Sequence, residues 1–268
     1  IISGKVVSQA KREELKNRVA QLNVQGTEVG LAVIIVGNNS ASRVYVNNKK
    51  KGCEEIGVNS YEYALPEETS QSELLELIEK LNGDDKVDGI LCQLPLPAHI
   101  DEQAVINSIN PQKDVDAFHP FNVGHIMIGD YTFLPCTPAG VMEMLKFYNI
   151  SVKGKKCVVI GRSNIVGKPM AMLLLKENGT VEICHSGTAN LKAECLGADV
   201  LVAAVGKAGF VTADMVKEGA VVIDVGINRG ADGRLCGDVC FDEVEKKASF
   251  ITPVPGGVGP MTITMLLE

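Results

Sequence analysis

The residues best suited to chemistry in this chain of 268 residues form a glycine turn, GRSNIVGKP at residues 161–169. The turn follows residues 157–160, a short apolar run rich in β-branched side chains that is typical of a buried parallel strand. It precedes residues 170–176, for which the pattern predicts a helix. A strand, a glycine turn and a helix in this order present backbone N–H groups and a positive helix end to a phosphate. Because the spacing departs from the usual G-x-G-x-x-G, a plain turn between a strand and a helix remains the alternative.

The nucleotide that such a turn accepts depends on the charges near the adenosine ribose. In a dinucleotide fold the second strand ends there, and an acidic residue binds the 2′-hydroxyl of NAD and repels the 2′-phosphate of NADP. Here residues 184–186 read CHS, without an acid, and Arg162 in the turn can form charge-assisted bonds to phosphate. The sequence therefore predicts NADP as the cofactor. A solvated turn residue remains the alternative for Arg162.

A second group of reactive side chains lies in the first half of the chain. Tyr45 and Lys49 are four positions apart in a predicted helix, residues 43–56, so they share one helix face. Gln93 follows a predicted strand, residues 87–91, and the two prolines after it end that strand, which places Gln93 at its carboxyl end. Lys49 also begins a run of three lysines, for which a solvated helix face is the alternative.

Alternating strands and helices must position these residues. The first alternation comprises predicted helices at 5–22, 43–56, 70–81 and 103–109 and predicted strands at 31–36, 61–65 and 87–91. Ser40 and Ser42 are the N-cap candidates for the second helix, and Gly57 is expected to end it. The second alternation comprises predicted strands at 157–160, 180–184, 200–205, 221–225 and 250–252.

This pattern predicts two α/β domains around a cleft, the second of them a Rossmann-like nucleotide-binding domain. Prolines near residues 135–138 indicate the boundary. We therefore expect residues 1–136, together with a closing helix at 261–268, to form one domain and residues 137–260 to form the other. Ligands of such folds bind at the carboxyl ends of the strands, so we expect the cleft to lie there.

Composition excludes several classes of partner. The formal net charge is −7 and no basic stripe offsets it, which argues against nucleic acid. No apolar run is long enough to span a membrane, and no basic-then-apolar leader opens the chain, although Ile1 in first position indicates a missing start. The eight cysteines lack C-x-x-C spacing and do not cluster with the four histidines. We therefore expect reduced cysteines, no metal site and a cytoplasmic location.

Seven motifs in order along the chain together point to one family. They are YVNNK at 45–49, QLPLP at 93–97, KDVD at 113–116, PCTP at 135–138, the glycine turn at 161–169, DVGIN at 224–228 and PVPGGVGPM at 253–261. Over nearly its whole length the chain resembles the bifunctional methylenetetrahydrofolate dehydrogenase/cyclohydrolases. The resemblance implies oxidation of 5,10-methylenetetrahydrofolate to the 5,10-methenyl cation and then hydrolysis to 10-formyltetrahydrofolate. It also implies a homodimer formed through the nucleotide-binding domain.

The resemblance further assigns roles to single residues. It implies that the folate is bound and converted by Tyr45, Lys49, Gln93 and Asp116, with Pro255 and Gly259 lining the pocket. Tyr45 would stack on the folate, Asp116 would accept hydrogen bonds from the pterin, and Lys49, oriented by Gln93, would transfer the proton of the hydrolysis. The cofactor would be bound by Gly161, Arg162, Ser163, Ser186 and Ile227. Without the family, Asp116 would be taken for a turn-forming residue.

Three positions depart from the family pattern. Ala117 stands where glycine is usual after KDVD, and Ala208 stands where proline is usual after Gly206-Lys207. Gly187 stands where many members have a basic residue, which weakens the expectation of NADP. The chain also ends within the family's closing helix, which we expect to be incomplete.

Other functions remain compatible with this pattern. The alternatives are an NADP-dependent dehydrogenase of another small substrate, a family member without good hydrolase activity, and a nucleotide-binding sensor. A sensor has no need of all four folate-side residues, so their presence argues against it.

Overall fold

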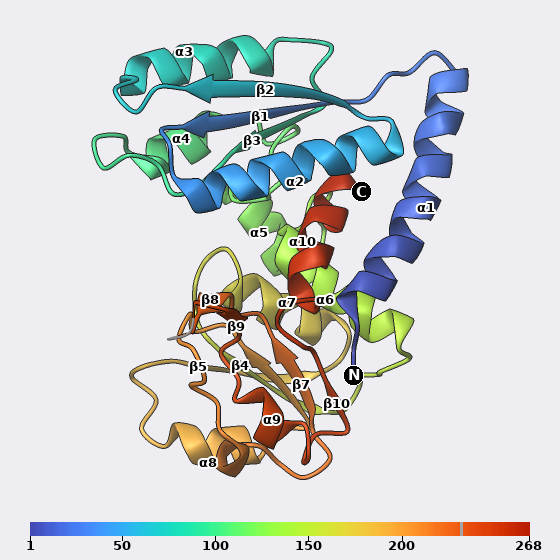
Figure 1. Cartoon of the computed structure of the whole chain (residues 1–268), viewed down its shortest axis with the longest axis vertical. Helices are drawn as coiled ribbons and strands as arrows, with labels where there is room; N and C mark the ends of the chain where they lie inside the picture. Colours follow the sequence, from blue (N-terminus) through green and yellow to red (C-terminus); the bar gives the residue numbers. More distant parts are fainter. Residues whose placement is uncertain (231–232) are drawn as a thin grey trace. The chain divides into compact units, whose positions relative to one another are not determined.

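The structure, a computed structural model, describes residues 1–230 and 233–268 and contains two compact units (Figure 1). The N-terminal unit comprises residues 10–125, 131–134 and 266–268, and the C-terminal unit comprises residues 1–9, 126–130 and 135–265. Each has its own parallel sheet, which confirms the predicted class of two α/β domains. Residues 1–9 and 261–265 belong to the C-terminal unit, whereas we expected them with residues 10–136. As a division of function, the predicted domains stay a prediction.

The N-terminal unit is built on three parallel strands in the order β2-β1-β3. They are β1 (Gly30–Val36), β2 (Asn59–Leu65) and β3 (Gly89–Cys92). Every residue of β1 is buried, because its sequence is apolar throughout and a strand pairs with each of its edges. Ile34 of β1 and Leu74 and Ile78 of the helix α3 (Gln71–Asn82) belong to one apolar core.

Helices α1 (Gly4–Val24), α2 (Ser40–Ile56), α3 (Gln71–Asn82), α4 (Glu102–Ser108) and α5 (Pro120–Ile128) occur in the first half of the chain. The N-cap of α2 is Asn39 and not Ser40 or Ser42, so that prediction was wrong. Asn39 has an extended backbone and its side chain accepts a hydrogen bond from the Ser42 N–H at 3.0 Å, whereas both serines lie inside the helix. Gly57 ends α2 as predicted, with a φ of +88°.

The C-terminal unit is built on five parallel strands in the order β10-β7-β6-β4-β5. They are β4 (Lys156–Ile160), β5 (Thr180–Cys184), β6 (Val200–Ala203), β7 (Val221–Asp224) and β10 (Phe250–Ile251), and a hairpin of β8 (Asn228–Arg229) and β9 (Leu235–Cys236) follows β7. The neighbours of β4 are β5 on one side and β6 on the other. The chain therefore reverses its direction across the sheet at β4, and such a switch point is where nucleotides bind in Rossmann-like folds.

The remaining helices are α6 (Cys136–Phe147), α7 (Gly167–Lys176), α8 (Leu191–Leu196), the 3₁₀ helix η1 (Ala213–Met215), α9 (Phe241–Val244) and α10 (Val258–Leu267). In the part of the chain that the structure describes, no helix combines the length and apolar character needed to cross a bilayer. All eight cysteines are free, and six of them are buried. Within the same residues, no three His, Cys, Asp or Glu side chains gather as metal ligands would.

Candidate active site

Helix α2 places Tyr45 and Lys49 one turn apart on one face. Lys49 is buried, with only 8% of its surface exposed, whereas Lys50 and Lys51 are exposed. The alternative that the lysine run is a solvated helix face was therefore wrong for Lys49. A buried amine needs a hydrogen-bond partner, and the Nζ of Lys49 donates to Oε1 of Gln93 at 3.0 Å. Burial also raises the pKa of the half-buried Tyr45 hydroxyl above its ordinary value.

Gln93 is held in place by the end of β3. Its backbone N–H donates to the carbonyl of Ile34 in β1 at 2.8 Å, which continues the ladder between the two strands by one residue. Its Nε2 donates to the Leu94 carbonyl at 2.8 Å, so its Oε1 is left to accept from Lys49. Gln93 thus lies at the carboxyl end of β3 as predicted, and the structure brings it together with Lys49.

Asp116 lies on a loop that is clamped at two earlier residues. Lys113 donates from Nζ to the carbonyls of Leu81 at 3.2 Å and Asp84 at 2.8 Å. Asp114 is 3% exposed, and its carboxylate accepts hydrogen bonds at 2.8 Å from the backbone N–H of His119 and from Nδ2 of Asn122. These contacts fix the loop and leave Asp116 half-buried.

The loop also pairs with β3, because Ile90 and Asp114 form a parallel bridge. Gln93 comes three residues after Ile90, directly after the end of the same strand. Strand β3 therefore fixes both Gln93 and the loop that contains Asp116. Ala117 next to Asp116 is buried with a φ of +55°, in the left-handed region that glycine adopts more easily. This conformation explains why glycine is the usual residue there, and shows that alanine can take it.

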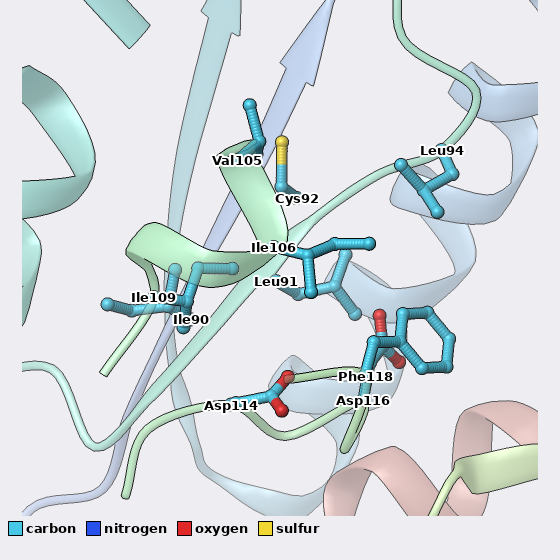
Figure 2. A pocket seen from close by; sticks show the side chains of 10 residues that line it. All are labelled: Ile90, Leu91, Cys92, Leu94, Val105, Ile106, Ile109, Asp114, Asp116 and Phe118. Atoms are coloured by element: carbon cyan, nitrogen blue, oxygen red, sulfur yellow. The ribbon is translucent and has the colours of Figure 1, made fainter. Parts of the chain in front are cut away.

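Figure 2 shows a small pocket behind this loop, with Asp114, Asp116 and Phe118 along one side and apolar side chains of β3 and α4 along the other. Its volume is about 10 Å³, enough for about one water molecule. It is therefore too small to hold a folate. Burial raises the pKa of the Cys92 thiol in its wall to about 12, and that of Cys53 on α2 to about 11, so neither thiol is a nucleophile at neutral pH.

In the C-terminal unit the glycine turn joins β4 to α7, as predicted. A Cβ on Gly161 would overlap the carbonyl oxygen of Ala204, and a Cβ on Gly167 would overlap the carbonyl oxygen of Gly161. Both positions therefore need glycine, because backbone segments approach closely there. Ser163 accepts hydrogen bonds on its hydroxyl from the N–H groups of Val166 at 3.1 Å and Gly167 at 3.3 Å, so it helps to start α7.

The register of β4 and β5 places two polar residues at matching positions beyond the carboxyl edge of the sheet. Ile160 pairs with Cys184, and Arg162 and Ser186 each lie two residues beyond these partners. Both are exposed. The backbone N–H of His185, which lies between Cys184 and Ser186 in the chain, donates to the Thr188 hydroxyl at 2.9 Å. The Arg162 guanidinium and the Ser186 hydroxyl can both donate hydrogen bonds to a phosphate, and residues 185–187 include no acid to repel it. These residues therefore fit the 2′-phosphate of NADP.

Three further candidates lie elsewhere in the C-terminal unit. Ile227 follows β7 and is 47% exposed. A Cβ on Gly259 in α10 would lie 3.7 Å from Cδ1 of Ile227, so a residue expected to line the folate pocket lies beside one expected to bind the cofactor. Pro255 is exposed in the loop before α10.

The site residues are thus divided between the two units. Tyr45, Lys49, Gln93 and Asp116 belong to the N-terminal unit, and the cofactor residues, Pro255 and Gly259 belong to the C-terminal unit. The predicted cleft between the domains stays a prediction.

Comparison with known proteins decides the family. The family model of the tetrahydrofolate dehydrogenase/cyclohydrolase catalytic domain matches residues 2–116, and that of the NAD(P)-binding domain matches residues 135–268. The chain belongs to the tetrahydrofolate dehydrogenase/cyclohydrolase family. The bifunctional protein FolD of Acetivibrio thermocellus is 62% identical over 268 residues, which cover 100% of this chain and 94% of that protein.

Solved structures of this family are closely similar. Bifunctional FolD of Campylobacter jejuni matches with a TM-score of 0.98 and 53% identity, over 100% of this chain and 95% of that one. FolD of Trypanosoma brucei, solved with NADP and an inhibitor, matches with a TM-score of 0.94 and 40% identity, over 100% of this chain and 94% of that one.

The protein is therefore an NADP-dependent methylenetetrahydrofolate dehydrogenase and a methenyltetrahydrofolate cyclohydrolase. It oxidises 5,10-methylenetetrahydrofolate to the 5,10-methenyl form and hydrolyses that to 10-formyltetrahydrofolate. The predicted family, reactions and cofactor are confirmed, in spite of Gly187. The roles of single site residues stay predictions.

Sequence reasoning missed the residues that hold this site in shape. Asp114 and Asn122 clamp the loop of Asp116, and neither had been singled out. Asp114 could have been found, because the KDVD motif contains two acids and only the second had a role. Asp224 and Asp238 in the C-terminal unit were missed as well, and both are buried.

Asp224 offers a test by pH. Burial raises the pKa of its carboxyl from 3.8 to about 6, against the lowering effect of hydrogen bonds from the N–H groups of Asp238, Val239 and Gly226. The raised pKa means that the folded state holds this proton more tightly than the unfolded state. Protonation of Asp224 therefore adds to the free energy of unfolding, fully below about pH 4, and this contribution is lost as the pH rises through about 6. We expect its carboxyl ¹³C signal, assigned with Asp224→Asn, to titrate near pH 6. A midpoint below the ordinary value would contradict this.

Proposed function

We propose that one folate site, formed by Tyr45, Lys49, Gln93 and Asp116, serves both the oxidation and the hydrolysis. The observation that supports this most directly is the buried amine of Lys49, held at 3.0 Å from Gln93 Oε1 one helix turn from Tyr45. A lysine withdrawn from solvent and oriented by an amide is suited to proton transfer. A lysine that served only solubility would lie in water, as Lys50 does.

In the oxidation the protein has to align the substrate with the cofactor, and it has no proton to move. The methylene carbon lies between two nitrogens, whose lone pairs stabilise the cation that forms when hydride leaves. When bound, NADP accepts that hydride. Asp116 holds the pterin by accepting hydrogen bonds from its amino group and ring N–H, and Tyr45 stacks on the aromatic part.

In the hydrolysis the protein has to move protons. Water adds its oxygen to the methenyl carbon, and the Nζ of Lys49 takes one proton from it. The oxygen then loses the second proton of that water as the formyl C=O forms, the bond from the carbon to one ring nitrogen breaks, and the nitrogen takes up a proton as it leaves. The products are 10-formyltetrahydrofolate and one proton released to solvent. Gln93 keeps the amine pointed at the carbon through its Oε1.

Arg162 and Ser186 are proposed to select NADP over NAD by binding the 2′-phosphate. Replacing Arg162 with alanine removes one charged phosphate contact, worth about 1.5–3 kcal/mol. We expect the Michaelis constant for NADP to rise roughly 10- to 100-fold, with little change for NAD and in the hydrolysis of supplied methenyl substrate. Lys168→Ala is the control, because this exposed cation of the same turn is held by Asn164 at 2.7 Å. Equal affinity for NAD and NADP in the unmodified protein would contradict the role of Arg162.

We also propose a homodimer formed through the nucleotide-binding domain, and a cytoplasmic location. The dimer is supported by large apolar side chains that the C-terminal unit leaves exposed, among them Phe147, Ile165 and Leu175. Light scattering tests it, because a dimer doubles the chain mass of 28.6 kDa. The location is supported by eight free cysteines, which are typical of a reducing compartment.

A further inference from the structure

Two buried carboxylates at the carboxyl edge of the C-terminal sheet have no role in the reactions described so far. Asp238 is 0% exposed and Asp224 is 3% exposed. A buried charge is retained only where hydrogen bonds compensate for lost hydration. The partners of these two carboxylates therefore indicate what they hold in place.

Asp238 binds two loops at once. Its Oδ2 accepts hydrogen bonds from the N–H groups of Val205 at 2.7 Å and Gly206 at 3.0 Å, and its Oδ1 accepts one from the N–H of Lys207 at 2.9 Å. Three successive N–H groups form an anion-binding nest, which Asp238 fills, so this loop after β6 is not available to a phosphate. The same Oδ1 accepts a fourth bond from Nδ2 of Asn228 at 2.9 Å, at the start of β8, where the loop after β7 ends.

Asp224 in turn holds Asp238. Its Oδ1 accepts from the backbone N–H of Asp238 at 2.9 Å and from that of Gly226 at 3.0 Å. Its Oδ2 accepts from the N–H of Val239 at 2.9 Å. The two carboxylates therefore act in series: Asp224 fixes the backbone at Asp238, and the Asp238 side chain fixes the two loops.

Two glycines make room for this arrangement. A Cβ on Gly226 would overlap the carboxylate of Asp238, and a Cβ on Gly237 would overlap that of Asp224. Each glycine thus allows backbone to approach a carboxylate more closely than any other residue would. The two glycines and the two carboxylates therefore fit one another closely, which is not expected of two acids buried by chance.

The loop after β7 presents Ile227 between two fixed neighbours. The N–H of Gly226 is held by Asp224, and the side chain of Asn228 is held by Asp238. Ile227 between them is 47% exposed and lies beside Gly259. The order β7-β6-β4-β5 places this loop and the Asp238 nest on the far side of the switch point from Arg162 and Ser186. A dinucleotide whose adenosine ribose lies at the end of β5 therefore extends its nicotinamide toward these loops.

We propose that Asp238, itself held by Asp224, is a positioning residue for the cofactor that fixes Val205, Gly206, Lys207 and Ile227 in the shape that receives the nicotinamide end. The inference rests on the proposed role of Ile227 in cofactor binding. It assigns Asp238 no contact with substrate or cofactor. Its effect passes through the two loops.

Asp238→Asn tests the proposal, because it keeps the shape of the side chain and replaces one acceptor oxygen with an NH₂ donor. Whichever way the amide turns, that NH₂ faces N–H donors, so residues 205–207 lose at least one of their three hydrogen bonds to this side chain. In the protein without cofactor, we expect amide hydrogen exchange at residues 205–207 to become at least about tenfold faster. We expect the dissociation constant of NADP to rise about 10- to 100-fold, and hydrolysis of supplied methenyl substrate to stay within about twofold.

Asp199→Asn is the matched control. Asp199 belongs to the same sheet but lies at its amino edge, where it accepts from the Lys156 N–H at 2.9 Å and from Lys217 Nζ at 2.6 Å. We expect this variant to keep normal NADP affinity and normal exchange at residues 205–207. Asn228→Ala is a milder second variant, because it frees only the Ile227 loop and leaves the nest filled. It is expected to weaken NADP binding severalfold with hydrolysis unchanged.

Unchanged NADP affinity in folded Asp238→Asn and Asn228→Ala would overturn the proposal. So would loss of hydrolysis in proportion to cofactor binding in both variants, because that result indicates a general defect in folding. The Ile227→Ala variant tests a separate point. If its NADP affinity is unchanged, the proposed contact between Ile227 and the cofactor is refuted. Exchange at residues 205–207 still reports whether Asp238 holds its loop, so failure of the two ideas can be distinguished.

Discussion

Replacing Asp116 with alanine is expected to weaken the binding of tetrahydrofolate substrates by about tenfold or more and to leave the affinity for NADP unchanged. The clamp formed by Lys113 and Asp114 fixes the loop, so the variant loses the carboxylate without losing the loop. A charge-assisted hydrogen bond contributes about 1.5–3 kcal/mol, and a pterin held by two such bonds loses both. Calorimetric titration with the folate and with NADP measures the two affinities.

Asp85→Ala is the control for this experiment, because Asp85 is an exposed acid of the same unit. It should leave both affinities as they are. Normal folate affinity in Asp116→Ala would make Asp116 a turn residue only.

Replacing Lys49 with methionine is expected to reduce hydrolysis of the methenyl substrate by roughly 10²–10⁴-fold, the usual contribution of general acid–base catalysis. Methionine keeps the apolar stem packed in its buried place and removes the amine that Gln93 orients. Oxidation should fall less, because hydride transfer needs Lys49 only to help place the ring. Absorbance assays on one preparation measure both rates.

Lys50→Met removes the next amine of the same helix, which is exposed, and should change neither rate. A Lys49→Met enzyme that hydrolyses at the unmodified rate would require another base. Equal losses in both rates would limit Lys49 to binding the substrate.

The strands of both sheets could be predicted to within about two residues, because all but the more polar β2 are short runs rich in β-branched and apolar side chains. Helix α6 was missed for a physical reason. From the sequence the prolines at 135 and 138 indicate a boundary, but they occupy the N-cap and the first turn of that helix, where a missing N–H costs nothing. Helix α5 contains Gly124 and lacks an alternation of polar and apolar faces, so its pattern gave no helical signal.

The site itself was predicted unevenly. The helix face of Tyr45 and Lys49 and the strand end of Gln93 follow from spacing alone, and the structure joins Lys49 to Gln93. Asp238 could not be found in this way. Three of the four partners named above are backbone N–H groups more than thirty residues earlier in the chain, and no side-chain pattern marks a backbone donor. Without its fold, a buried carboxylate cannot be distinguished from a surface acid.

The claim that one folate site serves both reactions is tested most directly by a single inhibitor. A tetrahydrofolate analogue that cannot carry the one-carbon bridge is titrated into both assays, each at saturating NADP, so that the same enzyme form is inhibited. A shared site predicts one inhibition constant for oxidation and hydrolysis, raised by the same factor in Asp116→Ala. Two different constants, or an Asp116→Ala variant that shifts only one of them, would contradict a shared site.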